Sequence, residues 1–202
     1  MSKRPWEFHV DLSRDRLQLI AEVLREVRKV TIPLHDPAAG DTPWGLGVRI
    51  YDRSAEVLSR RGPELWDWFR VIKPPLEFVF TVGDVPMRFC RDDPDNPDAQ
   101  HLRVSDIEAE QHEFAFGTPS VDLIWRMVVA ANPAGETENV YVIGATRSGH
   151  VKCKYTIPPL EGGILFINPS LSPRAPGGVE LPPPVVKPRE RTTQKAQDDK
   201  DL

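Results

Sequence analysis

The 202-residue chain lacks any long apolar run, since its longest uninterrupted apolar stretch covers only residues 127–131. A membrane-spanning helix needs about 20 apolar residues, so the sequence predicts no membrane segment. The N-terminus also lacks a secretory signal, because Trp6, Glu7 and His9 interrupt the apolar run that such a signal requires. We therefore expect a cytoplasmic protein.

Cysteine is scarce, and Cys90 and Cys153 are too few for a disulfide framework or a common four-ligand zinc site. None of the five histidines lies within four residues of another, so we predict no metal site and no cofactor. The sequence also lacks glycine-rich phosphate loops, the paired-histidine zinc motif and the nucleophile elbow of hydrolases. No motif identifies a reaction, and these absences favour a protein that is not an enzyme.

The overall composition is that of a folded protein, with 40% hydrophobic and 28% charged residues. Proline is distributed unevenly, because nine of the 21 prolines follow residue 157, whereas all 16 aromatic residues lie between Trp6 and Phe166. A proline-rich segment without large apolar side chains cannot offset the entropy lost on ordering its backbone. The sequence therefore predicts one domain over residues 1–168 and a disordered, proline-rich, mixed-charge tail over residues 169–202.

Residues 14–30 have the apolar period of an amphipathic helix, with Ser13 in the N-cap position. The apolar face consists of Leu17, Ile20, Val23, Leu24, Val27 and Val30. We expect this N-terminal helix to pack on a sheet. A second helical region is predicted in two pieces, residues 53–61 and 63–71, which start at an Asp52 or Ser54 cap and are separated by a break at Gly62.

The strands are predicted from alternating apolar and polar residues. Residues 76–82 and 85–89 alternate on either side of Gly83-Asp84, which is typical of a tight hairpin. Three further strands are expected over residues 121–131, 139–146 and 151–157. Helices followed by strands predict an α+β fold, with an antiparallel sheet of about five or six strands covered by the N-terminal helix.

The charge pattern contains one strongly acidic window, residues 92–113, with eight acidic residues and a single basic one, Arg103. The domain as a whole has 20 basic and 25 acidic residues, which makes nucleic acid an unfavourable partner. The start of the window resembles a calcium loop in spacing but lacks its central glycine and final glutamate. A short helix is expected after Ser105, with its charges exposed. We predict that this window binds a basic protein partner through Asp92, Asp93, Asp95, Asp98, Glu108 and Glu110.

The preferred hypothesis is a non-enzymatic binding or adaptor protein, of the immunity, antitoxin or assembly-factor type. The alternative is a small hydrolase or phosphate-handling enzyme centred on His150, with Arg147 and Lys152 as the other catalytic candidates. His101 and His112 could form a metal site together with one carboxylate, but their place beside the acidic window favours two surface histidines. A second alternative is a self-assembling structural component, whose sheet edges pair between copies of the chain.

Overall fold

A computed structural model describes residues 3–73, 77–117, 123–132 and 137–160 of the chain. The predicted tail over residues 169–202, and its boundary with the domain at residue 168, lie outside the described residues and stay predictions. Within the described ranges the chain forms three α-helices and one sheet of six strands. No helix in this part of the chain is long and apolar enough to cross a membrane.

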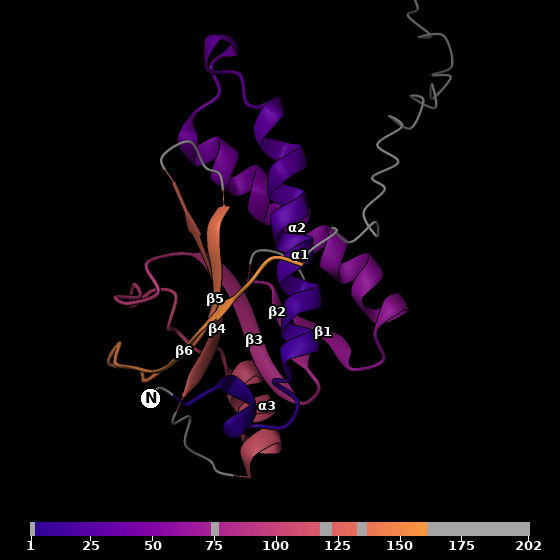
Figure 1. Cartoon of the computed structure of the whole chain (residues 1–202), viewed down its shortest axis with the longest axis vertical. Coiled ribbons are helices and arrows are strands. Elements are labelled where there is room, and N and C mark those ends of the chain that lie inside the picture. The colour runs from indigo at the N-terminus through magenta and orange to yellow at the C-terminus, as the bar shows by residue number, and fades with distance from the viewer. Residues whose placement is uncertain (1–2, 74–76, 118–122, 133–136, 161–202) are drawn as a thin grey trace, which may run out of the picture. The chain divides into compact units, whose positions relative to one another are not determined.

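The six strands lie in the sheet in the same order as in the chain (Figure 1). They are β1 (Phe69–Lys73), β2 (Val79–Val82), β3 (Val85–Arg91), β4 (Ile124–Ala131), β5 (Thr137–Ala145) and β6 (Val151–Ile157). All neighbouring strands are antiparallel except β3 and β4, which are parallel. The predicted α+β class is confirmed, and the parallel pair is the difference from the expected meander.

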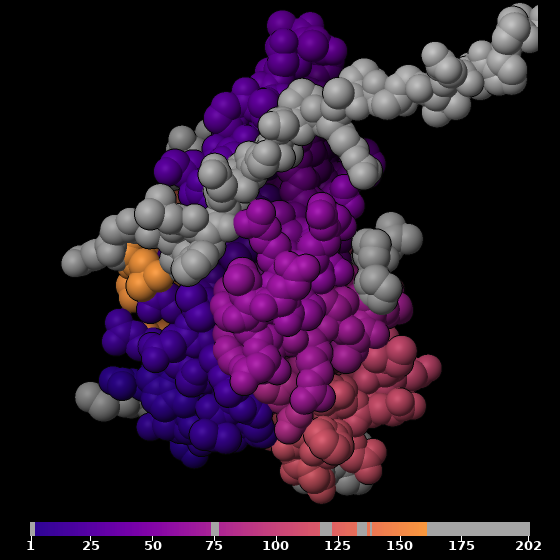
Figure 2. Space-filling view, turned by 90° about the vertical axis from the view of Figure 1, so that its right-hand side faces the viewer, coloured from indigo at the N-terminus to yellow at the C-terminus, as the bar shows by residue number. Residues whose placement is uncertain are grey.

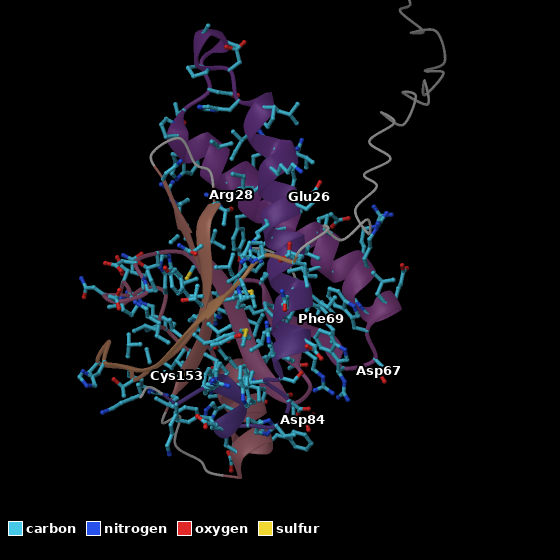
Figure 3. The ribbon with its side chains drawn as sticks, in the orientation of Figure 1. Glu26, Arg28, Asp67, Phe69, Asp84 and Cys153 are labelled. Carbon is cyan, nitrogen blue, oxygen red and sulfur yellow. The ribbon has the colours of Figure 1, made fainter. Side chains whose placement is uncertain are left out.

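The N-terminal helix α1 (Arg14–Thr31) matches the predicted range of residues 14–30 closely. The Ser13 hydroxyl accepts a hydrogen bond from the backbone N–H of Arg16 at 3.4 Å, as expected of an N-cap. Leu17, Ile20 and Leu24 are buried against the sheet in the main apolar core. Arg28 lies on the side of α1 that faces the sheet (Figure 3). Val27 is buried as well, whereas Val23 and Val30 of the predicted apolar face are only partly buried.

The second helix, α2 (Pro43–Leu65), differs from the prediction at both ends. It begins at a Thr42 cap rather than at Asp52 or Ser54, and it runs through Gly62 without a break. A Cβ atom at Gly62 would lie 2.5 Å from the Phe69 ring, so this glycine makes room for that ring. The predicted helical piece over residues 63–71 was wrong, because Phe69 starts β1 and stacks on Phe80 with 5.1 Å between ring centroids.

The hairpin of β2 and β3 is confirmed, with Gly83 at φ +60° in its turn. The predicted strands after residue 121 correspond to β4, β5 and β6. A parallel pair needs a long crossover connection, and residues 92–123 provide it between β3 and β4. This crossover contains the acidic window and the helix α3 (Asp106–Phe116). The acidic window is therefore part of the architecture of the sheet, not a loop appended to it.

Candidate functional site

The first part of the acidic window folds into a loop that closes around Asp92. The Asp92 carboxylate accepts hydrogen bonds from the backbone N–H groups of Asp93 and Asp98, both at 2.8 Å. Its Oδ2 also lies 2.7 Å from His101 Nδ1. Pro94 and Pro97 in the same loop are buried. Asp92 is thus largely used by the loop itself, and its side chain is only 11% exposed.

Three other predicted partner-binding residues of this loop are at the surface. Asp95 forms an ion pair with Lys154 of β6, with 2.6 Å between Oδ1 and Nζ. Asp93 accepts a hydrogen bond from the backbone N–H of Asp95, and Asp98 accepts one from Gln100. Such bonds within a loop stabilise its turns and leave the carboxylates facing solvent. Asp93 and Asp98 therefore keep an accessible negative charge.

Glu108 contradicts the expectation that the charges of the short helix are exposed, because it is only 3% exposed. Its carboxylate forms ion pairs with Arg126 on β4 at 2.5 Å and with Arg88 on β3 at 2.7 Å. Arg88 and Arg126 are direct neighbours in the parallel register. Burial lowers the pKa of Arg126, and the charge of Glu108 opposes that shift. Glu108 therefore ties α3 to the sheet and is a structural residue.

The outward face of α3 consists of five exposed residues: Asp106, Ile107, Glu110, Glu113 and Phe114. Residues three and four apart in a helix are surface neighbours, so Glu110 adjoins each of the other four. Phe114 is 72% exposed and Ile107 is 46% exposed. In the space-filling view α3, coloured pink to salmon, forms a projecting part of the surface (Figure 2). We call these five residues the acidic-aromatic face of α3.

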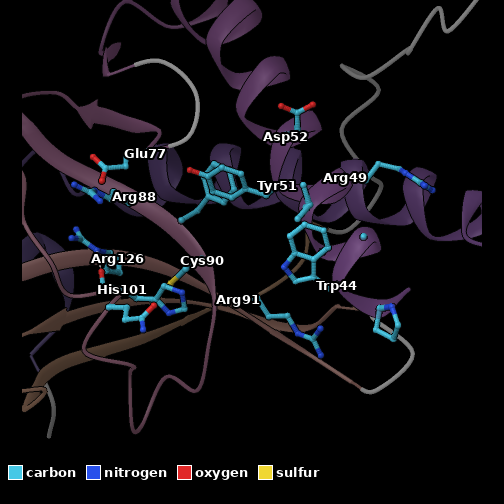
Figure 4. Close-up of a pocket in the computed structure, with 16 residues that line it drawn as sticks. Trp44, Arg49, Tyr51, Asp52, Glu77, Arg88, Cys90, Arg91, His101 and Arg126 are labelled. Atoms are coloured by element: carbon cyan, nitrogen blue, oxygen red, sulfur yellow. Dashed lines mark hydrogen bonds between the residues drawn. The ribbon is translucent and has the colours of Figure 1, made fainter. Parts of the chain in front are cut away.

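A groove of about 950 Å³ lies between the first turns of α2 and the end of β3 (Figure 4). Its apolar wall carries Trp44, which is 79% exposed. The opposite wall carries Cys90 and Arg91 of β3, together with His101 from the Asp92 loop. Burial, followed by the charge of Asp92, raises the pKa of the Cys90 thiol to about 12, so this thiol is protonated at neutral pH.

Sequence reasoning missed this groove because its residues come from three segments that are remote in the chain. Trp44, Cys90 and His101 belong to α2, β3 and the crossover, and no spacing rule connects them. The exposure of Phe114 on α3 was also missed. In the sequence, Phe114 lies among alternating apolar and polar residues, where a phenylalanine is expected to belong to the core. The helical spacing of this segment could have indicated the exposure, because it places Ile107 and Phe114 on the same helix face as the charged Glu110.

The predicted catalytic candidates lie together at the surface but without a carboxylate. His150, Arg147 and Lys152 are all exposed in or beside the turn between β5 and β6. The backbone N–H of His150 donates to the Thr146 hydroxyl at 3.1 Å. Among the described residues, none of the three candidates forms an ion pair with a carboxylate. The geometry therefore does not favour a catalytic site centred on His150.

His101 and His112 have separate partners, contrary to the idea of a site that joins them. His101 contacts Asp92, whereas the buried His112 lies 3.1 Å from the backbone oxygen of Leu123 and stacks on Phe116. Comparison with known proteins adds no guide to function, because no protein family, no curated protein and no solved structure matches the chain. The functional argument therefore depends on the geometry described above.

Proposed function

We propose that this protein is a non-enzymatic binding protein that engages a basic protein partner through the acidic-aromatic face of α3. One observation carries the proposal: every exposed residue of α3 up to Phe116 is either a carboxylate or a large apolar side chain. An exposed apolar anchor surrounded by a polar rim is the usual anatomy of a protein-binding patch. Phe114 is the anchor of this patch, and Asp106, Glu110 and Glu113 are its charged rim.

The sign of the charge specifies the chemistry of the partner. Within the described residues, no ion pair neutralises Asp106, Glu110 or Glu113, so their field reaches the solvent. Asp93 and Asp98, in the loop that precedes α3, add two further exposed carboxylates. Such a surface repels nucleic acid and steers positively charged proteins towards it, mainly by raising the association rate. Glu108 and Asp92 do not belong to this surface, because they face inward.

The test compares three full-length variants. Phe114→Ser removes the anchor, Glu110→Lys reverses the central charge, and Glu56→Lys is the matched control, at an exposed carboxylate of α2. A pull-down from the native cell extract identifies a candidate, whose binding is then measured with purified proteins. We expect Glu110→Lys to lower the association rate about tenfold at low salt and less at high salt, and Phe114→Ser to speed dissociation.

The control variant should bind the partner as the wild type does. The proposal would be overturned if Glu56→Lys weakened binding as much as Glu110→Lys, since the effect would then be general electrostatics. It would also be overturned if no basic protein bound through α3. The self-assembly alternative has less support, because the outer strands carry Arg70 and Lys73 on β1 and Lys152 and Lys154 on β6, and lysine on an edge strand discourages edge pairing.

A further inference from the structure

Three side chains of different chemistry meet on the wall of the groove. The ligand atoms of Cys90, Asp92 and His101 all lie within 4.8 Å of one another, and all three side chains are partly buried. Figure 4 shows the Cys90 sulfur beside the His101 ring, whereas the Arg91 side chain extends to the other side. Thiolate, carboxylate and imidazole are the three side-chain groups that bind zinc most often in proteins.

The scaffold holds each of these side chains in place before any ligand binds. Cys90 is fixed by its pairing with Val128 in the parallel register of β3 and β4. The Asp92 carboxylate is oriented by the hydrogen bonds that it accepts from two backbone N–H groups. The backbone N–H of His101 donates to Asp98 at 3.0 Å, and its backbone oxygen accepts from Arg126 Nε at 2.6 Å. The main-chain contacts fix the positions of Cys90 and His101 in the fold, and the two hydrogen bonds to Asp92 orient its carboxylate, as outer contacts do for metal ligands.

We propose that Cys90, Asp92 and His101 form a binding site for a divalent transition metal of the zinc and cobalt class. A sulfur ligand excludes calcium and magnesium, which prefer oxygen. Three protein ligands leave one tetrahedral position for water or a ligand in the groove, where Cys90 and His101 are already among the lining residues. On binding, the metal replaces the thiol proton of Cys90, which leaves to solvent. The imidazole of His101 binds through Nδ1 as a neutral ligand and keeps one proton, on Nε2, so that a proton now between Nδ1 and Asp92 is exchanged through solvent for the one on Nε2.

The local charge balance is compatible with a dication. A thiolate and a carboxylate supply two negative charges, and the neighbouring Arg126 is already paired with Glu108 at 2.5 Å. Arg91 lies 3.4 Å from the backbone oxygen of Asn132, away from the cluster. Ligand atoms about 2.0 Å from a tetrahedral metal are about 3.3 Å apart, so His101 and Asp92 must separate by about half an ångström from their present 2.7 Å.

The sequence did not predict this site, because the spacing of its ligands matches no common zinc motif: Cys90 and Asp92 are two residues apart, and His101 follows nine residues later. We expected no metal site, and the loop that closes around Asp92 is the reason for the revision. The inference does not depend on the proposed function, because none of the three ligands belongs to the acidic-aromatic face of α3. Either proposal can fail while the other holds.

The test is a titration of the chelator-treated, full-length protein with Co²⁺ in the presence of a phosphine reductant. We expect saturation at one ion per chain, with the near-ultraviolet band of thiolate-to-cobalt charge transfer and visible bands of low coordination number. Zn²⁺ should then displace Co²⁺ and bleach the spectrum. Cys90→Ser should abolish the charge-transfer band, and the matched control Cys153→Ser should retain it, since Cys153 is buried in the main core.

The other ligands provide a second measurement that does not depend on the band. Asp92→Asn and His101→Gln should each lower Zn²⁺ affinity by at least about tenfold in a competition assay, whereas His150→Gln should not change it. Circular dichroism checks that each variant is folded. The proposal is overturned if the folded wild type gives no saturable thiolate band with millimolar Co²⁺, or if the band survives Cys90→Ser.

Discussion

Glu108 and Arg126 form an ion pair between α3 and β4, with 2.5 Å between Oε1 and Nη1 and both side chains at most 3% exposed. Arg126 donates further hydrogen bonds to the backbone oxygens of His101 and Arg103. One buried guanidinium thus holds the crossover at three points. This arrangement links the two candidate sites, because His101 belongs to the metal cluster and Glu108 fixes the helix that carries the acidic-aromatic face.

We expect Glu108→Ala to be strongly destabilising, because it leaves the Arg126 charge buried without its carboxylate. Removal of one partner from a buried pair costs about 3–5 kcal/mol. Glu110→Ala, two residues away on the exposed face, should change the free energy of unfolding by less than about 0.5 kcal/mol. Urea denaturation of the two variants measures both values. Equal stability of the two variants would contradict the structural role assigned to Glu108.

Sequence reasoning recovered the elements whose residues follow a local period. The α1 helix was found from its apolar face and its Ser13 cap, and the β2–β3 hairpin from its alternation around Gly83. The β1 strand was missed because its five residues follow a helix without an obvious turn, and because Phe69 is positioned by stacking on Phe80. Contacts of that kind are tertiary, and no local propensity encodes them.

The candidate sites show the same limit more clearly. A charge count located the acidic window but could not separate Glu108, which is buried, from Glu110, which is exposed. That separation depends on the parallel pairing of β3 and β4, which places Arg88 beside Arg126. A crossover was not anticipated, because the strands on either side of it were expected to be antiparallel. Because the crossover was not predicted, the proximity of His101 to Cys90 could not be predicted either.

Gly62 and Gly47 of α2 should respond to alanine in opposite directions. A Cβ at Gly62 would meet the Phe69 ring at 2.5 Å, whereas a Cβ at Gly47 would meet nothing within 4 Å. Gly47→Ala should stabilise the protein by about 1 kcal/mol, as expected of an open helical position. Gly62→Ala should destabilise it by about 1 kcal/mol or more, because overpacking outweighs helix propensity. Thermal unfolding of both variants measures these changes in stability. A Gly62→Ala variant more stable than the wild type would contradict the close contact between Gly62 and the Phe69 ring.

Gly83 and Gly40 form a second matched pair, since both have positive φ, at +60° and +95°. Alanine costs about 1–2 kcal/mol in such a conformation. At Gly40 there is nothing within 4 Å of the added Cβ, but at Gly83 it would lie 2.0 Å from the carboxyl carbon of Asp11. We expect Gly83→Ala to be the more destabilising variant. The excess should shrink in an Asp11→Ala background, and a fully additive double-mutant cycle would rule out the contact.

Asp11 also gives a prediction about pH, because it holds the β2–β3 turn. Its Oδ2 accepts from the backbone N–H of Asp84 at 3.1 Å, and its Oδ1 pairs with Arg16 at 2.5 Å. Burial raises the pKa of Asp11. The hydrogen bond from Asp84 and the interactions with Arg16 lower this pKa by more than burial raises it, so the pKa lies below its ordinary value. The ionised carboxylate therefore stabilises the folded protein.

A carboxyl group whose pKa is lower in the folded state stabilises the protein above its unfolded pKa, which is about 3.9 for aspartate. That stabilisation is lost as the pH falls through the folded pKa. We therefore expect Asp11→Asn to be less stable than the wild type at pH 6, with a difference that shrinks as the pH is lowered below about 4. Urea denaturation of both proteins at several pH values measures this difference. A gap that stayed constant from pH 6 to the acid limit of folding would show that the charge of Asp11 is not what holds the turn.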